Sequence, residues 1–329
     1  MATDRMKNFR PKRLWRGGWV LLSLAGCVAP VEEVGGASAS APAPVVEPAE
    51  RIAPPLASGA RLLQWLDPDA VGATLVGARM ELDVDAIATL FGLPIQGARM
   101  LREIEMAEEG LQVIFGADLE RVFAPEVLAM LPPIGRGSTI LRALRAPRAE
   151  IEAALRDHEM EESFTEGFSV WAPTGAFPWK VVLLGEDALA LALVPRAEIG
   201  EIGPLTAARD LPPSTLRREL EQIAGAPDLM LEMVAQGPFL HTELSDDVGV
   251  VRLSVRRWQG RGIDGGVMLQ ALGDPGEGAA ELRTRELVGE SDRLRELARR
   301  VVFSAEPPMI VGRVQLSAED AAALRRRPR

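Results

Sequence analysis

The sequence contains no tyrosine, one cysteine and two histidines among its 329 residues. A disulfide needs two cysteines, so the chain forms none within itself. The two histidines, His158 and His241, lie far apart, whereas metal sites need clustered His, Cys, Asp or Glu ligands. The Gly-x-Ser-x-Gly and Ser-x-x-Lys patterns of serine nucleophiles are also missing. These absences leave few ways to build an active site, and the sequence predicts neither a metal nor a cofactor.

Positive charge is scarce as well. The chain has 37 Lys and Arg against 47 Asp and Glu, a net charge of -10. Its only lysines are Lys7, Lys12 and Lys180. Nucleic-acid binding depends on clustered positive charge that neutralises phosphates. The composition therefore argues against a nucleic-acid partner.

The sequence does contain an amino-terminal segment with the order of an export signal. A basic head precedes a short apolar run, Gly17 to Ala29, which ends at Pro30. The head is formed by Lys7, Arg10, Lys12, Arg13 and Arg16. A transmembrane helix needs about 20 apolar residues, and this run is shorter. A basic head, a short apolar core and then small residues are typical of a cleaved signal peptide.

The signal ends in Leu24-Ala25-Gly26-Cys27, which closely resembles the lipobox of bacterial lipoproteins. The resemblance covers residues 1–27 only. It implies that residues 1–26 are a signal peptide and that the Cys27 thiol carries fatty-acyl chains such as palmitate in the cell envelope. In some bacteria an aspartate after the cysteine is linked to inner-membrane retention. Val28 stands there instead, which favours the outer membrane over the inner membrane, whereas an accidental match in a cytosolic protein is the alternative.

Cleavage would change the charge and leave a tether before the folded part. Residues 1–26 hold six basic residues and one acidic residue, so their removal lowers the net charge from -10 to -15. Residues 27–58 are rich in proline and alanine, which disfavours helices and strands, and we expect a disordered tether. The remainder is predicted to form two halves, residues 59–205 and residues 206–329.

Hydrophobic periodicity predicts the elements of residues 59–329. We expect strands at 71–80, 111–115, 138–144, 168–171, 179–184, 188–194, 229–235, 248–258, 266–272 and 310–316. We expect helices at 84–91, 98–109, 118–131, 147–158, 215–224, 277–287, 292–303 and 318–325. Asp83, Ser214 or Thr215, and Ser317 are expected as N-caps. Gly110 is expected to end the second helix.

Strand and helix blocks alternate without a regular βαβ rhythm. This order indicates an α+β fold with a largely antiparallel sheet and packed helices. One segment echoes another, because Leu75–Asp83 resembles Ile310–Ser317 and each runs from a strand into a capped helix. The echo suggests two similar halves, with chance similarity as the rival explanation.

The candidates for ligand chemistry are few. His241, Asp246 and Asp247 come first, since a loop could gather them with the nearby Glu243. A solvated acidic loop is the competing interpretation. His158 with Glu162 comes second, although a histidine near a helix C-terminus is also explained by the helix dipole. No catalytic residue is predicted.

Two functions from different classes remain. The first is a non-catalytic lipoprotein of the cell envelope, which contacts the membrane through lipid on Cys27 and acts by protein contact or as a structural component. The second is a carrier that holds a lipid or another apolar ligand between the sheet and its helices, which needs an apolar cavity of several hundred cubic ångströms. An enzyme ranks third.

Overall fold

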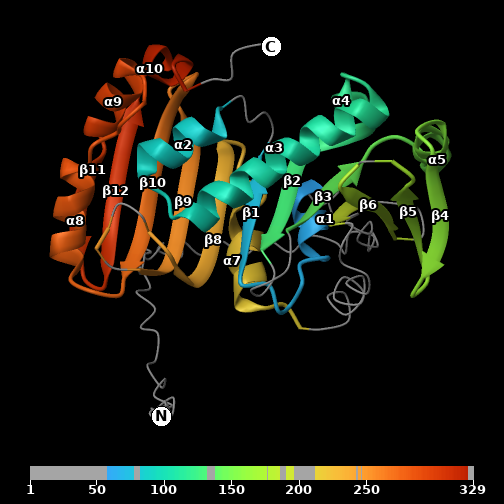
Figure 1. Ribbon diagram of the computed structural model, residues 1–329, viewed down its shortest axis with the longest axis horizontal. Coiled ribbons are helices and arrows are strands. Elements are labelled where there is room, and N and C mark those ends of the chain that lie inside the picture. Colours follow the sequence, from blue (N-terminus) through green and yellow to red (C-terminus); the bar gives the residue numbers. More distant parts are fainter. Residues whose placement is uncertain are drawn as a thin grey trace, which may run out of the picture. The chain divides into compact units, whose positions relative to one another are not determined.

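A single antiparallel sheet of twelve strands runs through the part of the chain that the structure describes (Figure 1). This computed structural model describes residues 58–77, 82–131, 138–175, 177–185, 190–195, 212–241, 244–245 and 247–324. These residues belong to one unit, Ala53–Arg329. The lipobox, the expected tether up to residue 57, Glu243 and Asp246 lie outside the described residues.

The strands follow one another without a parallel pair. They are β1 (Gly72–Val76), β2 (Phe123–Leu131), β3 (Thr139–Leu144), β4 (Met160–Thr165), β5 (Phe168–Pro173), β6 (Trp179–Leu184), β7 (Ala190–Pro195), β8 (Leu229–Phe239), β9 (Val248–Trp258), β10 (Gly262–Ala271), β11 (Val302–Glu306) and β12 (Met309–Leu316). Their order across the sheet is β11-β12-β10-β9-β8-β1-β2-β3-β7-β6-β5-β4, and every neighbouring pair is antiparallel. β1 thus joins the strands that precede residue 205 to those that follow it.

Helices cover both faces of this sheet, as Figure 1 shows. The described helices are α1 (Ser58–Leu63), α2 (Val84–Phe91), α3 (Ile95–Phe115), α4 (Leu119–Val122), α5 (Arg148–Asp157), α7 (Thr215–Ile223), α8 (Pro275–Thr284), α9 (Asp292–Arg299) and α10 (Ala318–Ala322). The expected α+β fold, with a largely antiparallel sheet and packed helices, is confirmed. Within the described ranges, no helix combines the length and the apolar character needed to span a bilayer.

Each face of the sheet has its own hydrophobic cluster of buried side chains. The larger one joins one face of the sheet to α2, α3, α5, α8 and α9, while the smaller one joins the other face to α1 and α7. The alternation of side chains along a strand explains this division. On β1, Ala73 and Leu75 belong to the smaller cluster and Val76 belongs to the larger one.

Three expected helix starts are confirmed by their capping bonds. The Asp83 carboxylate accepts from the backbone N–H groups of Asp85 and Ala86. The hydroxyl oxygens of Ser214 and Ser317 do the same at the starts of α7 and α10. Such caps satisfy donors that have no partner inside the helix.

The prediction that a helix ends at Gly110 and a strand follows at 111–115 is wrong, because α3 continues to Phe115. Leu111 and Ile114 are buried and keep the three- and four-residue spacing of the helix. Gly110 instead permits a close contact, since a Cβ there would lie 2.7 Å from Cε2 of Phe177. The helix ends at Gly116, whose φ of 82° is in the left-handed region.

The helix expected at 118–131 is also wrong. Only α4 is helical, and β2 follows it between β1 and β3. Proline inside a helix removes a hydrogen bond and clashes with the preceding turn, which disfavours a helix through Pro125. The pairing register of β2 with β3 shifts between Phe123 and Val127, and Pro125 lies within this irregularity.

Two more boundaries differ at the carboxyl-terminal end. The helix expected at 292–303 stops at Arg299, and β11 begins at Val302. β10 begins at Gly262, four residues before the start of the strand expected at 266–272. Gly265 lies against the ring of Phe91, where a Cβ would come within 2.4 Å of Cζ. Gly265 therefore allows the Phe91 ring to lie close against the backbone of β10.

The strand β4 at one edge of the sheet was not predicted. Its first residue, Met160, is buried and the other five are exposed, so the strand has no alternating apolar pattern. Glu166 and Gly167, with φ values of 53° and 84°, form the two-residue turn to β5. This turn geometry suits the right-handed twist of a hairpin.

Candidate functional site

His241, the first candidate from the sequence, is buried and bonded to the backbone. The residue is 3% exposed, and its Nε2 lies 2.6 Å from the carbonyl oxygen of Gly92. Because a carbonyl oxygen only accepts, Nε2 carries a proton in this contact. Gly92 is the C-cap of α2. His241 therefore fastens the segment after β8 to the end of α2.

The structure does not assemble a ligand cluster around His241 from the residues it describes. Asp247 is exposed, and its backbone carbonyl accepts from the N–H of Leu272 at 3.1 Å. Asp246 and Glu243 lie outside the described residues. Across the described ranges, no three His, Cys, Asp or Glu residues are grouped so as to hold a metal ion.

The second candidate pair has local partners. His158 is exposed at the end of α5, where its Nδ1 lies 2.9 Å from the carbonyl oxygen of Ala154. Glu162 accepts from the Ser169 hydroxyl at 2.7 Å. The first contact matches the expectation that His158 satisfies the end of a helix.

A different site lies between α8 and α9. A cavity of about 470 Å³ opens there, and we refer to it as the arginine pocket. Leu282 and Ala298, both buried, form its apolar part. The charged residues around it are Arg283, Arg285, Glu286, Arg295 and Arg299. Among the described residues, four arginines and one glutamate therefore line the same cavity.

Capped helices and a tight loop place these arginines. The Asp274 carboxylate accepts from the N–H of Gly276 at 2.7 Å and starts α8. The Ser291 hydroxyl accepts from the N–H of Leu294 at 3.2 Å and starts α9. The loop 285–291 between the two helices turns at Gly289, whose φ is 85°. Arg285 and Glu286 on this loop therefore face the pocket together with the two helices.

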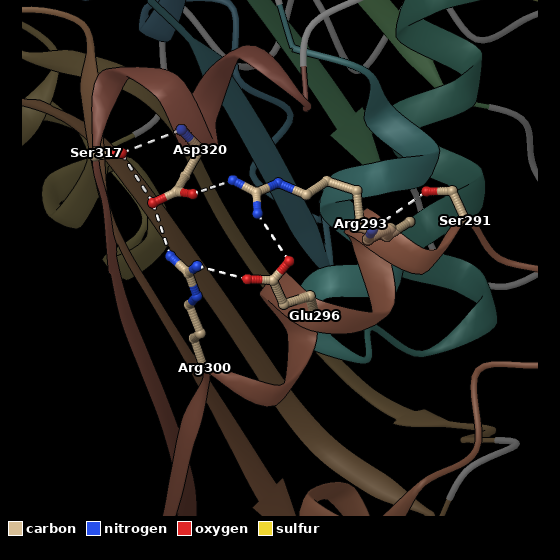
Figure 2. A network of polar contacts seen from close by, with 7 residues as sticks. Ser291, Arg293, Glu296, Arg300, Ser317 and Asp320 are labelled. Carbon is tan, nitrogen blue, oxygen red and sulfur yellow. Dashed lines mark hydrogen bonds and ion pairs between the residues drawn. The ribbon is translucent and has the colours of Figure 1, made fainter.

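A polar network holds α9 to α10, as Figure 2 shows. Asp320 accepts from Nη1 of Arg300 at 2.7 Å, from the Ser317 hydroxyl at 2.8 Å and from Arg293. Glu296 accepts from Nη1 of Arg293 and Nη2 of Arg300, each at 2.8 Å. The hydrogen bond from Ser317, followed by the bond from Arg300, lowers the pKa of Asp320 below its ordinary 3.8. Arg293 and Arg300 are thereby committed to carboxylates.

The pocket arginines are less neutralised. Arg283 donates to the carbonyl of Ala279 at 3.0 Å, and Arg285 donates to two carbonyls at the end of α2. A carbonyl satisfies a donor but leaves the positive charge in place. Arg295 pairs with the fully exposed Asp292. Arg299 makes no ion pair with any residue that the structure describes. Arg283 and Arg299 thus bring positive charge to the pocket without a carboxylate partner among the described residues.

A second cavity, of about 420 Å³, lies between α3, α4 and the sheet. Its arginine, Arg142, has a side chain that is 6% exposed and forms an ion pair with Glu108. Nη2 of Arg142 donates to the carbonyl of Ala124 at 2.9 Å, and the guanidinium lies 5.2 Å from the Phe123 ring centre. Nε of Arg142 is buried without a partner. Arg142, the one cation among the described residues that line this cavity, is thus matched by the carboxylate of Glu108.

Sequence reasoning missed the arginine pocket. Its members come from two helices and a loop, and their charges converge only when the chain folds. Two signals were present, namely Arg283 and Arg285 at the end of a predicted helix and Arg295 and Arg299 one turn apart on the next. Each pair is common on solvated helices, so neither pointed to a site alone.

Comparison with known proteins gives no family for the chain. No family model matches the sequence, and no curated protein matches it either. Among solved structures, crystal form I of TP0453 is similar with a TM-score of 0.46 and 11% identity, over 80% of this chain and 95% of that chain. Crystal form IV of TP0453 gives a TM-score of 0.43 and 10% identity, over 79% and 95% of the two chains.

Proposed function

We propose that this protein is a lipid-anchored component of the bacterial cell envelope that binds a phosphate-bearing anion in the arginine pocket. The observation that carries the proposal is the gathering of four arginines around one cavity in a chain with a net charge of -10. A local excess of cations creates a positive electrostatic potential on a protein that is negative as a whole. A positive potential attracts anions.

The chemistry of the pocket favours phosphate over other anions. A guanidinium is planar and offers paired N–H donors that match two phosphate oxygens. Such charge-assisted bonds are about twice as strong as bonds between neutral groups. Two of the four arginines, Arg283 and Arg299, have no carboxylate partner among the described residues. A phosphate between α8 and α9 would supply the missing negative charge.

We propose binding without turnover. Catalysis by proton transfer needs a group whose pKa lies near the working pH. Arginine stays protonated at all relevant pH values, and Glu286 is the one carboxylate among the described residues that line the pocket. The pocket therefore offers charge and shape, and no acid–base pair.

The anchor is a proposal that rests on Leu24-Ala25-Gly26-Cys27 behind a basic head. More than one acyl chain is needed for stable attachment to a bilayer. Mass spectrometry of the mature amino terminus should find a diacylated Cys27 as the first residue. An intact Met1 or a free thiol at Cys27 would contradict the anchor while leaving the pocket untested.

The pocket is tested by titration of the detergent-extracted protein with inorganic pyrophosphate in a calorimeter. We expect saturable binding that weakens as salt is added. Arg299→Glu should reduce the affinity at least about ten-fold, since it removes one charge-assisted contact and adds repulsion. The matched control is Arg313→Glu, on the exposed side of β12. Equal loss in both variants, or no saturable binding, would overturn the proposal.

The alternative of an apolar carrier has less support from the described cavities. A carrier needs a cavity lined by apolar side chains, whereas both cavities described above have charged walls. The space between α3 and the sheet is filled by fully buried side chains such as Leu101 and Leu111. The polar pocket is therefore preferred as the binding site.

A further inference from the structure

We propose that the phosphate bound in the arginine pocket is the head group of an anionic phospholipid, so that this edge of the protein lies on the membrane surface. The inference rests on the proposed function, because it names the source of the anion for the same pocket. It requires one further feature beside the arginines, namely an apolar side chain that can enter the acyl region.

Val288 supplies that feature. It lies in the loop 285–291, lines the pocket and is 86% exposed, more than any other large hydrophobic residue that the structure describes. Its neighbour Leu287 is partly buried against the core, so the loop is fastened on one side and projects an apolar tip on the other. A large exposed apolar residue beside arginines is the arrangement of a membrane-surface segment, whose cations reach phosphates while its apolar side chains enter the lipid.

The charges restrict this contact to one part of the protein. An acidic protein is repelled by an anionic bilayer, so only a locally basic surface can approach it. Arg293 and Arg300 on α9 are bonded to Asp320 and Glu296 and contribute little free charge. Arg283 and Arg299 have no carboxylate partner among the described residues, and Val288 lines the same pocket.

The other end of the sheet provides an internal control. Phe164 on β4 is 73% exposed, and the residues two positions away on either side are the exposed Glu162 and Glu166. Val288 also has glutamates two positions away, Glu286 and Glu290, but it shares its pocket with four arginines, whereas β4 and its turn contain none. An anionic membrane is therefore repelled at Phe164 without a compensating cation on that strand. Exposure alone predicts that Phe164 and Val288 behave alike, whereas the proposal predicts that they differ.

The test uses the full lipid-modified protein, reconstituted through its own anchor into phosphatidylcholine vesicles with or without phosphatidylglycerol. Val288→Cys and Phe164→Cys are each labelled with an environment-sensitive fluorophore, and nitroxide-labelled lipids serve as quenchers. We expect quenching at position 288 that requires phosphatidylglycerol, and none at position 164. Adding Arg295→Glu and Arg299→Glu should lower the quenched fraction at 288 at least about ten-fold.

The outcomes separate the two proposals. Quenching at both positions, or at neither, overturns the membrane contact. If the calorimetric titration still shows pyrophosphate binding that Arg299→Glu abolishes, the pocket binds a soluble anion and the proposed function stands. If pyrophosphate binding is absent as well, both proposals fail. Quenching at 288 that persists in pure phosphatidylcholine also overturns the inference, because the arginines would then play no part.

Discussion

Arg142 and the arginines between α8 and α9 show two uses of the same side chain. Arg142 is buried in the larger helix-covered face of the sheet, paired with Glu108 and bonded to the Ala124 carbonyl. Arg299 and its neighbours line an open pocket where cations outnumber carboxylates. A buried charge requires a matched partner, since an unpaired one is costly to remove from water. An exposed charge is solvated by water and does not need a protein partner. It is therefore available to bind an anionic ligand.

The comparison teaches where function should be sought in an acidic protein. Where each cation has a carboxylate, as around Asp320, the arrangement is explained by the joining of helices (Figure 2). Where arginines outnumber carboxylates, as in the arginine pocket, the joining of helices does not explain the unmatched positive charge. Mutation of Arg142 should therefore affect stability more than anion binding, and mutation of Arg299 should affect anion binding more than stability.

The largest loss of stability is expected from Arg142→Ala. The change leaves Glu108, whose side chain is 23% exposed, without its partner and opens space in the core. We expect the free energy of unfolding to fall by about 3 kcal/mol, measured by urea denaturation. The double variant Arg142→Met with Glu108→Leu should recover most of this loss, because apolar residues of similar volume replace the pair. A single variant as stable as the wild type would contradict the structural role.

Arg285→Ala should cause the next largest loss of stability, and it should also weaken pyrophosphate binding. One of its nitrogens donates to the carbonyls of Thr89 and Leu90 at 2.7 Å, and its guanidinium lies 5.5 Å from the Phe303 ring centre. Loss of these contacts should lower the free energy of unfolding by about 2 kcal/mol. Arg285→Lys serves as the comparison, since an ammonium keeps the charge but not the planar contact. If the two variants are equally stable, the geometry of the guanidinium has no role.

A smaller, pH-dependent effect is expected from Asp320→Asn. The pKa of Asp320 is lowered by Ser317 and then by Arg300, so its charge stabilises the fold above its ordinary pKa and this contribution is lost as the pH falls through the lowered value. Thermal melts should show the variant less stable than the wild type at pH 7, by about 1 kcal/mol. The difference should narrow below pH 3.8. Asp292→Asn, which removes a carboxylate whose side chain is 96% exposed, is the control for the loss of one negative charge near α9.

The smallest effect on stability should come from Arg299→Ala. The side chain is exposed and makes no ion pair with the described residues, so the free energy of unfolding should change by no more than about 0.5 kcal/mol. Its pyrophosphate affinity should nevertheless fall clearly, unlike that of Arg313→Ala. A variant of Arg299 that destabilises the fold as much as Arg285→Ala would remove the distinction between the two kinds of arginine.

Much of the fold could be predicted because local chemistry determines it. Asp83, Ser214 and Ser317 cap helices with their own side chains, and β9 shows a long run of buried and partly buried residues that was expected over the same range. One error occurred where a distant contact decides. Gly110 reads as a helix end in sequence but lies against Phe177 in space.

The binding site was less predictable than the fold for the same reason. His241 attracted notice as a rare residue, yet its Nε2 bonds to Gly92, 149 positions away. The pocket arginines attracted none, because arginine is the ordinary cation of this chain. Only the fold, which brings α8, the loop 285–291 and α9 to one cavity, shows which arginines lack a carboxylate among the described residues. The anchor at Cys27 is the reverse case, a prediction made from sequence that lies outside the described residues.

The edge strand β4 has a consequence for how copies of the protein behave when they are crowded. An uncovered edge offers free N–H and C=O groups to any passing strand, and unprotected edges promote aggregation. Glu161 and Glu162 are adjacent on β4, so their side chains project to opposite faces of the strand. A second copy that aligned its own β4 would set glutamates near glutamates on either face. Mutual repulsion thus keeps neighbouring sheets from merging, and high local density remains compatible with separate molecules.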